Sequence, residues 1–404
     1  MRAKVAQSTA WGILMTNNIA KKDLLSYGFL AMPIAFAGIP LYIHAPDFYA
    51  TEFGVSLASL GIILLVLRLI DAIQDPIIGI ISDKYSNKRP LIMAFSAIVL
   101  AISFTLLFKP LGGSYVLWFA VFIFLATTSF SVLTINLNVL GGLWSKDKNQ
   151  KTTIAGVREA LGLIGLILAV TLPSLFSQNM EKEQSFLYVS IILSVMIVLA
   201  ILVYLMWQNK YQDINKVKAA KKIKSSDIKK ISSDTKKFLS VYTISMLASG
   251  IPAVLVLFFI RDRLNLESFT GLFLLAYFLS AALGIVIWKA LSVRYGKYKA
   301  WLMAMILAVV SFFWAYFLKE GDMIQYAVIC VLSGVAFGAE LVLPTSILAD
   351  HIHDNKKESQ ASLHYGALAF LAKASFAIAV ALSLPFLDAM GFTPDSYNKK
   401  EALH

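Results

Sequence analysis

Long apolar segments dominate this 404-residue sequence, and a helical membrane protein is the fold that fits them. Hydrophobic residues make up 58% of the chain and charged residues only 15%, a balance too apolar for a water-soluble protein of this length. A helix of about 20 apolar residues crosses the hydrocarbon region while satisfying its own backbone hydrogen bonds. The sequence predicts eleven such spans, at residues 25–44, 57–82, 90–109, 115–143, 152–176, 184–207, 238–260, 268–291, 300–318, 323–349 and 362–388.

A lysine-rich segment, YQDINKVKAAKKIKSSDIKKISSDTKK (211–237), separates the first six predicted spans from the last five. Short basic turns follow the second and eighth spans, at GIISDKYSNKRP (79–90) and ALSVRYGKYKAW (290–301), as two related halves would give. The sequence predicts a cytoplasmic N-terminal tail (1–23) and a six-helix half (24–208). A basic cytoplasmic linker (209–237) and a five-helix half (238–404) follow.

The chain has a net charge of +12, and the distribution of its basic residues is explained by membrane topology rather than by nucleic-acid binding. Basic residues gather in alternate connections, such as Lys84, Lys88 and Arg89 after the second span. The opposite connections, such as 45–56, carry few or none, which is the positive-inside pattern. The sequence therefore predicts a multi-pass integral protein with a cytoplasmic N-terminus, whose partners are the bilayer and a small-molecule substrate, with no nucleic acid and no indication of an oligomer.

The run RLIDAIQDP (68–76) places three charges inside the second predicted span. Arg68, Asp71 and Asp75 are spaced i, i+3 and i+7, so a helix puts them on one stripe. Charges in the hydrocarbon region are costly and face a bundle interior, where they neutralise one another or a passing ion. Two carboxylates against one arginine can bind one Na⁺ or H⁺, with Arg68 orienting them. A salt-bridged structural cluster is the alternative.

Two further charges lie deep in the C-terminal half, and their positions along the predicted helices agree with the depth of Asp71. At about 1.5 Å per residue, Asp71, Glu340 and Lys373 each lie roughly 13–17 Å from the cytoplasmic end of their spans. They can therefore meet at one level. Glu340 either contributes to substrate binding or forms a structural pair with Lys373, and Lys373 is too deep to reach the interface easily.

The segment RLIDAIQDPIIGIISDKYSNKRP (68–90) resembles the second helix and following loop of the glycoside–pentoside–hexuronide cation symporters, a branch of the major facilitator superfamily. Supporting resemblances lie in GVREALGLIG (156–165), LPTSILADHIHD (343–354) and ALAFLAKASFA (367–377). The resemblance implies an all-α major facilitator fold with two pseudo-symmetric halves, in a bacterial inner membrane. It also implies that Asp71 and Asp75 bind the coupling cation, and that Arg158 and Lys373 act in substrate binding or coupling.

This chain departs from the melibiose-permease-like pattern on the fourth predicted helix. In SVLTINLNVLGG (131–142), Thr134 stands where those permeases carry an aspartate and Asn138 where they carry a sugar-stacking tryptophan. We expect Thr134 in the cation site and Asn138 in the substrate site. The lost carboxylate removes a hard oxygen ligand, so H⁺ is favoured over Na⁺ as the coupling ion, with no other cofactor.

Charged residues at the cytoplasmic ends of the spans resemble gating elements. Asp83 and Arg89 match the superfamily's cytoplasmic gate, although simple positive-inside topology also explains the basic residues there. The cluster Asp350, His351, His353 and Asp354 admits a metal interpretation, but a gating ion pair between Asp350 and loop lysines fits its place better, so no metal is expected. Arg158, shallower in its span, either reaches the substrate cavity or holds headgroups.

The sequence carries no enzyme signature such as a Walker loop or an HExxH motif. It predicts a secondary active transporter that moves a small organic solute, with a sugar or glycoside as one candidate, by cation symport and alternating access. The alternatives are a carrier of lysolipid or another amphiphile, an inactive truncated transporter, and a membrane acyltransferase using His351 or His353. The family has twelve helices and the chain ends at TPDSYNKKEALH (393–404), so the last helix is expected to be missing.

Overall fold

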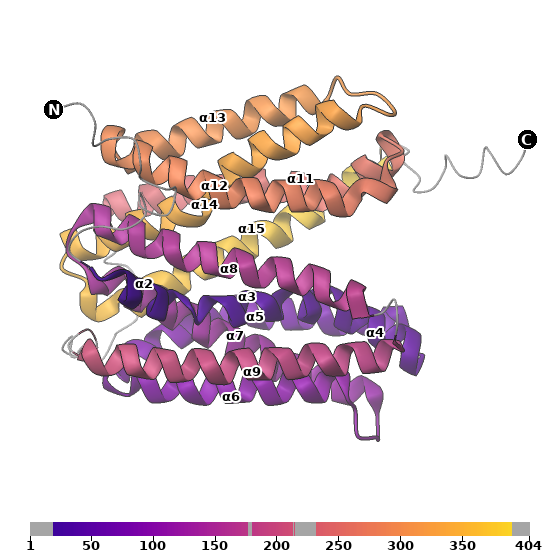
Figure 1. The fold of residues 1–404 in the computed structure, drawn as a ribbon, viewed down its shortest axis with the longest axis horizontal. Helices are drawn as coiled ribbons and strands as arrows, with labels where there is room; N and C mark the ends of the chain where they lie inside the picture. The colour runs from indigo at the N-terminus through magenta and orange to yellow at the C-terminus, as the bar shows by residue number, and fades with distance from the viewer. Residues whose placement is uncertain (1–18, 177–179, 213, 215–231, 390–404) are drawn as a thin grey trace, which may run out of the picture. The chain divides into compact units, whose positions relative to one another are not determined.

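The computed structural model describes residues 19–176, 180–212, 214 and 232–389, and in this part of the chain the regular elements are all helical (Figure 1). The predicted all-α class is therefore confirmed. Most of the predicted N-terminal tail, most of the linker and residues 393–404 lie outside the described residues. The chain divides into two compact units, Met1–Lys230 with Thr345–Ala369, and Ile231–Pro344 with Phe370–His404.

The first unit contains the first six predicted spans. Its elements are α2 (Lys21–Gly28), α3 (Ala31–Ile39), the π-helix η1 (Pro40–His44), α4 (Ala45–Phe53), α5 (Leu57–Lys84), η2 (Ser86–Lys88), α6 (Arg89–Phe108), α7 (Tyr115–Trp144), α8 (Lys148–Phe176) and α9 (Lys182–Lys210). The helices α6 and α9 lie side by side, and α3 packs along α8 (Figure 1). At the end of the unit where α9 stops, Tyr27 packs its ring against Trp144 and Trp207.

The remaining elements belong to the second half of the sequence. They are α11 (Ser233–Phe258), the π-helix η4 (Phe259–Arg263), η5 (Glu267–Phe269), α12 (Thr270–Tyr295), α13 (Lys297–Ala315), α14 (Met323–Asp354), η6 (Glu358–Gln360) and α15 (Ala361–Ala389). The last residues of α14 and the first residues of α15 are grouped with the first unit, while the rest of both helices is grouped with the second.

Ten helical segments of the described chain are long and apolar enough to cross a membrane. The first is built from α2, α3, η1 and α4 together, over Lys21–Phe53. The remaining predicted span, the second along the chain, corresponds to α5, a helix of 28 residues that carries Arg68, Asp71 and Asp75 within it. The structure thus places a helix at each of the eleven apolar segments.

The helix α5 has two unlike faces. Large apolar side chains are exposed along one stripe, at Ile62, Leu65, Leu69 and Ile73. Asp71 and Asp75 lie on the other side and are buried, with Asp75 fully so. Exposed apolar side chains suit contact with lipid, whereas the buried carboxylates face neighbouring helices. Ser56 starts the helix by accepting the backbone N–H of Ser59 on its side chain.

The first helix of each half of the sequence changes from α to π geometry at a matching place. In both, a proline lies seven residues before a five-residue π-helix, with Pro33 before η1 and Pro252 before η4. A π turn widens the helix locally and is often found at functional positions. This match adds to the two basic turns as a sign of internal repetition.

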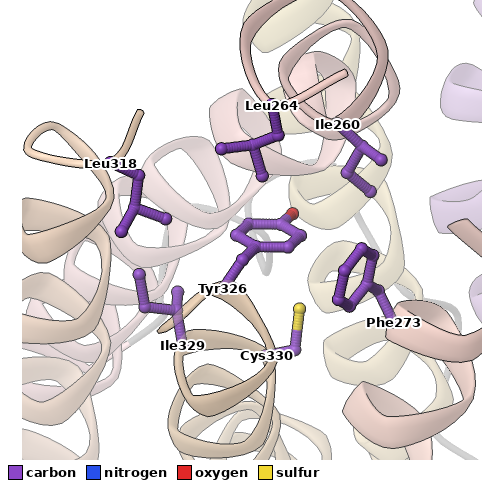
Figure 2. Close-up of a cluster of buried hydrophobic side chains, with 7 residues drawn as sticks. All are labelled: Ile260, Leu264, Phe273, Leu318, Tyr326, Ile329 and Cys330. Carbon is purple, nitrogen blue, oxygen red and sulfur yellow. The ribbon is translucent and has the colours of Figure 1, made fainter. Parts of the chain in front are cut away.

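A cluster of buried apolar side chains forms part of the core of the second unit. It lies where η4 ends and α14 begins, and Figure 2 shows its members gathered around the ring of Tyr326. The members are Ile260, Leu264, Phe273, Leu318, Tyr326, Ile329 and Cys330. Cys330 is the only cysteine in the sequence and is buried here as an apolar side chain.

Candidate functional site

The predicted cation site lies within the first unit, where α5 packs along α7. Asp71 is 7% exposed and Asp75 is 0% exposed, so both carboxylates have been removed from water. A carboxylate in the membrane interior must be matched by hydrogen-bond donors, by a cation or by a proton. For Asp71, side chains of the protein itself supply hydrogen-bond donors to the carboxylate.

Two neutral side chains donate to Asp71. The Oδ1 atom of Asp71 accepts the Gln74 amide at 2.7 Å and the Ser131 hydroxyl of α7 at 3.1 Å. Thr128, one turn earlier on α7, donates to the Gln74 carbonyl oxygen at 3.1 Å and so fixes the amide in the orientation that donates to Asp71. The result is a chain of polar groups across the α5–α7 contact.

Arg68 and Tyr42 complete one wall of this site. Both side chains line a small cavity together with Asp71, and the Arg68 guanidinium carbon is 6.0 Å from the centre of the Tyr42 ring. Arg68 is exposed, unlike the two carboxylates. The charged stripe predicted from the sequence therefore runs from an exposed arginine to a fully buried aspartate.

Thr134 and Asn138 continue along α7 beyond Ser131. Within the described residues, the Thr134 hydroxyl oxygen is buried and has no hydrogen-bond partner, so it is available to a ligand. Asn138 and Arg158 line one small cavity of about 10 Å³, which has room for about one water molecule. The Arg158 guanidinium donates to Glu159 on the same helix, with an Nε to Oε1 distance of 3.1 Å.

Glu340 is held by an aromatic side chain of a neighbouring helix. Its Oε2 atom accepts the Trp301 indole N–H at 2.7 Å. Lys373 itself is half-buried in α15.

Asp83 and Arg89 form a buried network at the start of α15. Asp83 Oδ1 accepts the backbone N–H of Ser362, and Oδ2 accepts that of Leu363, each at 2.9 Å. Arg89 donates to the Ser362 hydroxyl at 2.9 Å and to the side-chain Oδ1 of Asn136 on α7 at 3.0 Å. A carboxylate at a helix N-terminus satisfies amide groups that have no partner within the helix and interacts favourably with its dipole. Asp83 therefore caps α15.

The Asp83 carboxyl lies one residue beyond the apolar segment 57–82. Burial raises the pKa of this carboxyl to about 6, although the hydrogen bonds from Ser362 and Leu363 and the charge of Arg89 act in the opposite direction. Its Oδ1 atom is 3.9 Å from the Arg89 guanidinium, and both side chains are 2% exposed. The desolvation of the carboxylate is thus larger than the compensation that its partners provide.

Two glycines allow α5 and α15 to approach closely. A Cβ atom at Gly79 would lie 2.4 Å from the Ser362 carbonyl oxygen, and one at Gly366 would lie 2.5 Å from the Asp75 carbonyl oxygen. Neither position has room for a side chain. The beginning of α15 therefore rests directly on the segment of α5 that carries Asp75 and, two turns later, Asp83.

Asp350 forms the ion pair with a loop-proximal lysine that the sequence predicts. The Lys151 ammonium lies 3.3 Å from Asp350 Oδ1 and donates to the Ala349 carbonyl at 3.0 Å. Nearby, exposed Lys148 pairs with Asp354 at 2.8 Å. His353 contacts Glu358 at 3.0 Å, and the described residues contain no cluster of three or more potential ligands that could hold a metal.

Three contributors to the site, Gln74, Thr128 and Ser131, were not predicted from the sequence. They are neutral polar residues, which are common in membrane helices and carry no charge signal. The i, i+3 spacing of Gln74 from Asp71 was available as a clue. The pairing of Asp83 with the backbone of α15 had no sequence signal, because it involves main-chain groups.

Comparison with known proteins assigns this sequence to a family. The sequence profile described as "MFS/sugar transport protein" matches residues 24–404. The isoprimeverose transporter of Lactiplantibacillus pentosus is 23% identical over 316 residues, covering 74% of this chain and 65% of that protein. The inner membrane symporter YicJ of Escherichia coli K12 is 27% identical over 164 residues, 38% of this chain and 35% of YicJ. This chain thus spans less than two thirds of either relative.

A more distant relative and a solved structure complete the comparison. The sodium-dependent lysophosphatidylcholine symporter 1 of Xenopus tropicalis is 22% identical over 415 residues, covering 89% of this chain and 76% of that protein. A crystal structure of the E. coli fucose:proton symporter FucP superimposes with a TM-score of 0.70 at 14% identity, covering 92% of this chain and 93% of FucP. These matches show a multi-pass membrane protein related to transporters. The chain belongs to the MFS/sugar transport protein family, within the glycoside–pentoside–hexuronide branch of the major facilitator superfamily that its second-helix motif resembles.

Proposed function

We propose that this protein is a cation-coupled symporter that moves a small organic solute by alternating access. The observation that carries the proposal is the buried carboxylate pair on α5, with Asp71 held by Gln74 and Ser131. Two buried carboxylates on the same helix as one exposed arginine favour uptake of one further positive charge, and a membrane transporter can couple that charge to transport. We place the protein in a bacterial inner membrane with its N-terminus in the cytoplasm.

The donor set favours H⁺ over Na⁺ as the coupling ion. Asp71 Oδ1 already accepts two hydrogen bonds, so that oxygen has little capacity left for a metal ion. The unpartnered hydroxyl of Thr134 supplies one oxygen but no charge. A Na⁺ site needs several converging oxygen ligands, whereas protonation needs one carboxylate oxygen.

The contacts around the start of α15 support a gate. Asp83 with Arg89, and Lys151 with Asp350, hold the beginning of α15 and the end of α14 against the other helices of the first unit. Asn138 and Arg158 line a cavity of about 10 Å³ at this level, too small for an organic solute. Passage of substrate therefore requires these contacts to open, and Asp83, Arg89 and Asp350 act as gating residues.

The first candidate substrate is a sugar or glycoside, which the similarity to the isoprimeverose transporter favours. The proposed substrate-binding or coupling residues are Arg68, Arg158, Glu340, Lys373 and Asn138. The second candidate is a carrier of lysolipid or another amphiphile. It is favoured by the similarity to a lysophosphatidylcholine symporter and by Asn138, which gives no aromatic face for a sugar ring.

Ion binding to the purified protein in liposomes tests the proposal without knowledge of the substrate. Proton release or uptake is followed with a pH dye, and Na⁺-linked stabilisation is followed by thermal unfolding. We expect a solute-independent ion signal in the wild type that is lost in Asp75→Asn. The control is Asp47→Asn, because Asp47 lies in α4 with 59% of its side chain exposed. An ion signal that persists unchanged in Asp75→Asn would refute the assignment.

A further inference from the structure

A second, larger cavity lies entirely within the second unit. Its volume is about 400 Å³, and residues of α11, η4, α12, α13 and α14 line it. The apolar cluster around Tyr326 forms part of its wall, as Ile260, Phe273, Ile329 and Cys330 belong to both (Figure 2). The described residues that line it include none from the cavities at the proposed cation site and at the gate.

Aromatic and aliphatic side chains dominate the wall of this cavity. The Phe273 and Tyr326 rings meet edge to face at 4.8 Å, and the Tyr277 and Phe337 rings stack at 5.4 Å between centroids. These contacts fix the rings and give the cavity a defined apolar surface. Among the described residues that form the wall, none is an aspartate, glutamate, lysine, arginine or histidine.

One of the hydroxyl groups on the wall is already satisfied within its own helix. The Ser333 hydroxyl already donates to the Ile329 carbonyl of its own helix at 2.7 Å. Such a local bond satisfies the hydroxyl without help from a ligand. Sugars need several converging donors and acceptors, so this wall discriminates against them and suits a hydrocarbon.

The volume also points to a hydrocarbon. An engineered apolar cavity of about 150 Å³ is large enough to hold benzene, and this cavity is more than twice that size. A void lined by apolar atoms forfeits dispersion contacts, which an apolar occupant would restore. Membrane-spanning helices surround the cavity, so hydrocarbon chains are the most abundant molecules available to fill it.

We propose that this cavity binds one alkyl chain of a lipid-like amphiphile. The chain lies against Phe273 and Tyr326, with the thiol of Cys330 on the cavity wall. The occupant comes from one of two sources, an acyl chain of the surrounding bilayer or a diffusible single-chain amphiphile. The inference goes beyond the proposed symport, since binding of an alkyl chain is measurable without ion coupling or transport.

Photolabelling of the full chain in lipid nanodiscs tests this site. The probe is a single-chain amphiphile with a photoreactive diazirine in its alkyl chain, and labelled peptides are mapped by mass spectrometry. We expect enrichment on the peptides that contain Phe273 and Tyr326. Ala315→Phe fills the cavity from α13 and should lower that labelling at least about tenfold, as expected for excluding two methylenes from an apolar site.

A matched variant separates the cavity from the outer surface of the same helix. Val309→Phe also adds an aromatic ring to α13, but Val309 is 68% exposed, so labelling of the cavity peptides should remain at the wild-type level. As a second readout, an alkyl amphiphile should slow reaction of Cys330 with a small membrane-permeant maleimide in the wild type. Both variants should elute as the wild type does in gel filtration.

Competition identifies the source of the chain. Displacement of the probe by lysophospholipid alone supports a diffusible amphiphile, whereas equal displacement by diacyl phospholipid supports a bilayer acyl chain; either outcome supports the site. Labelling confined to exposed positions, or unchanged in Ala315→Phe with Cys330 equally reactive, would overturn it. Ion binding in Asp75→Asn is measured in a separate experiment. Failure of the alkyl-chain site can therefore be told apart from failure of the proposed ion coupling.

Discussion

Asp83 Oδ1 accepts the backbone N–H of Ser362 at 2.9 Å, although the two residues are 279 positions apart in the sequence. The same carboxylate also accepts the amide of Leu363. One side chain at the end of α5 thus supplies the N-terminal cap of α15, a role that a residue next to the helix normally fills. The folding of α15 at this end depends on α5 being in place.

Removal of this cap should loosen the start of α15. Asp83→Ala leaves the buried amides of Ser362 and Leu363 without their acceptor, and hydrogen bonds to charged groups contribute about 1.5–3 kcal/mol. We expect hydrogen exchange of these two amides to accelerate by about tenfold or more. Lys84→Ala, at an exposed neighbouring residue, is the control. Exchange that stays at the wild-type rate in Asp83→Ala would contradict the capping role.

Asp83 should also make stability depend on pH. Its pKa is about 6 in the folded protein against an ordinary value of 3.8, so the folded state binds the proton more tightly than the unfolded state. This contribution to the free energy of unfolding is fully present below about pH 4 and is lost as pH rises through about 6. Thermal unfolding between pH 4 and 8 should therefore show a steeper fall in the wild type than in Asp83→Asn. Parallel pH profiles would exclude Asp83 as the cause.

The two lysine–aspartate pairs near the end of α14 should differ in strength. Lys151 is 1% exposed and pairs with Asp350, whereas Lys148 and Asp354 are 59% and 51% exposed. Lys151→Ala leaves a largely buried carboxylate without its cation and should lower the free energy of unfolding by about 3–5 kcal/mol. Lys148→Ala should cost about 0–1 kcal/mol, an effect that salt removes. Thermal unfolding at low and high ionic strength measures both, and equal losses would refute the difference.

The close approach of α5 and α15 can be tested with a single methyl group. Gly79→Ala places a Cβ atom 2.4 Å from the Ser362 carbonyl oxygen and should destabilise the protein by about 1–3 kcal/mol through overpacking. Gly61 lies in the same helix with nothing within 4 Å of the position that a methyl group would take, so Gly61→Ala should be neutral or stabilising by up to about 1 kcal/mol. Comparable unfolding midpoints for the two variants would show that the helices separate readily.

Ser131 should matter for coupling although it carries no charge. Ser131→Ala removes one of the two donors to Asp71 Oδ1, and a neutral hydrogen bond contributes about 0.5–1.5 kcal/mol. We expect ion binding to the purified protein to change by about two- to tenfold. Ser129→Ala, which alters a buried serine two residues away on another face of α7, should leave it unchanged. Equal effects of both substitutions would point to packing rather than to Asp71.

Features that the sequence predicted well depend on residues close together in the chain. The eleven apolar segments, the stripe of Arg68, Asp71 and Asp75 and the ion pair of Asp350 all follow from helical spacing and hydrophobicity. The family was identifiable from the same second-helix motif, because charges are rare in membrane helices and their spacing is therefore informative.

Features that the sequence did not predict depend on contacts between distant segments. The Glu340 carboxylate accepts the indole N–H of Trp301 from α13, a contact that the depth of Glu340 along its helix did not predict. Depth along a helix axis fixes one coordinate, but the rotation of each helix decides which side chains meet. Ser131 was missed for the same reason, since its role depends on which face of α7 meets α5.

Gly366 bears on how tightly ion movement is coupled to substrate movement in the proposed symporter. Because no side chain separates α15 from the Asp75 carbonyl, the first turns of α15 cannot shift without disturbing the backbone beside the buried carboxylate. The same turns are capped by Asp83. In the proposed symporter, the gate therefore cannot move independently of the ion site. This backbone contact opposes a leak in which ions cross without substrate.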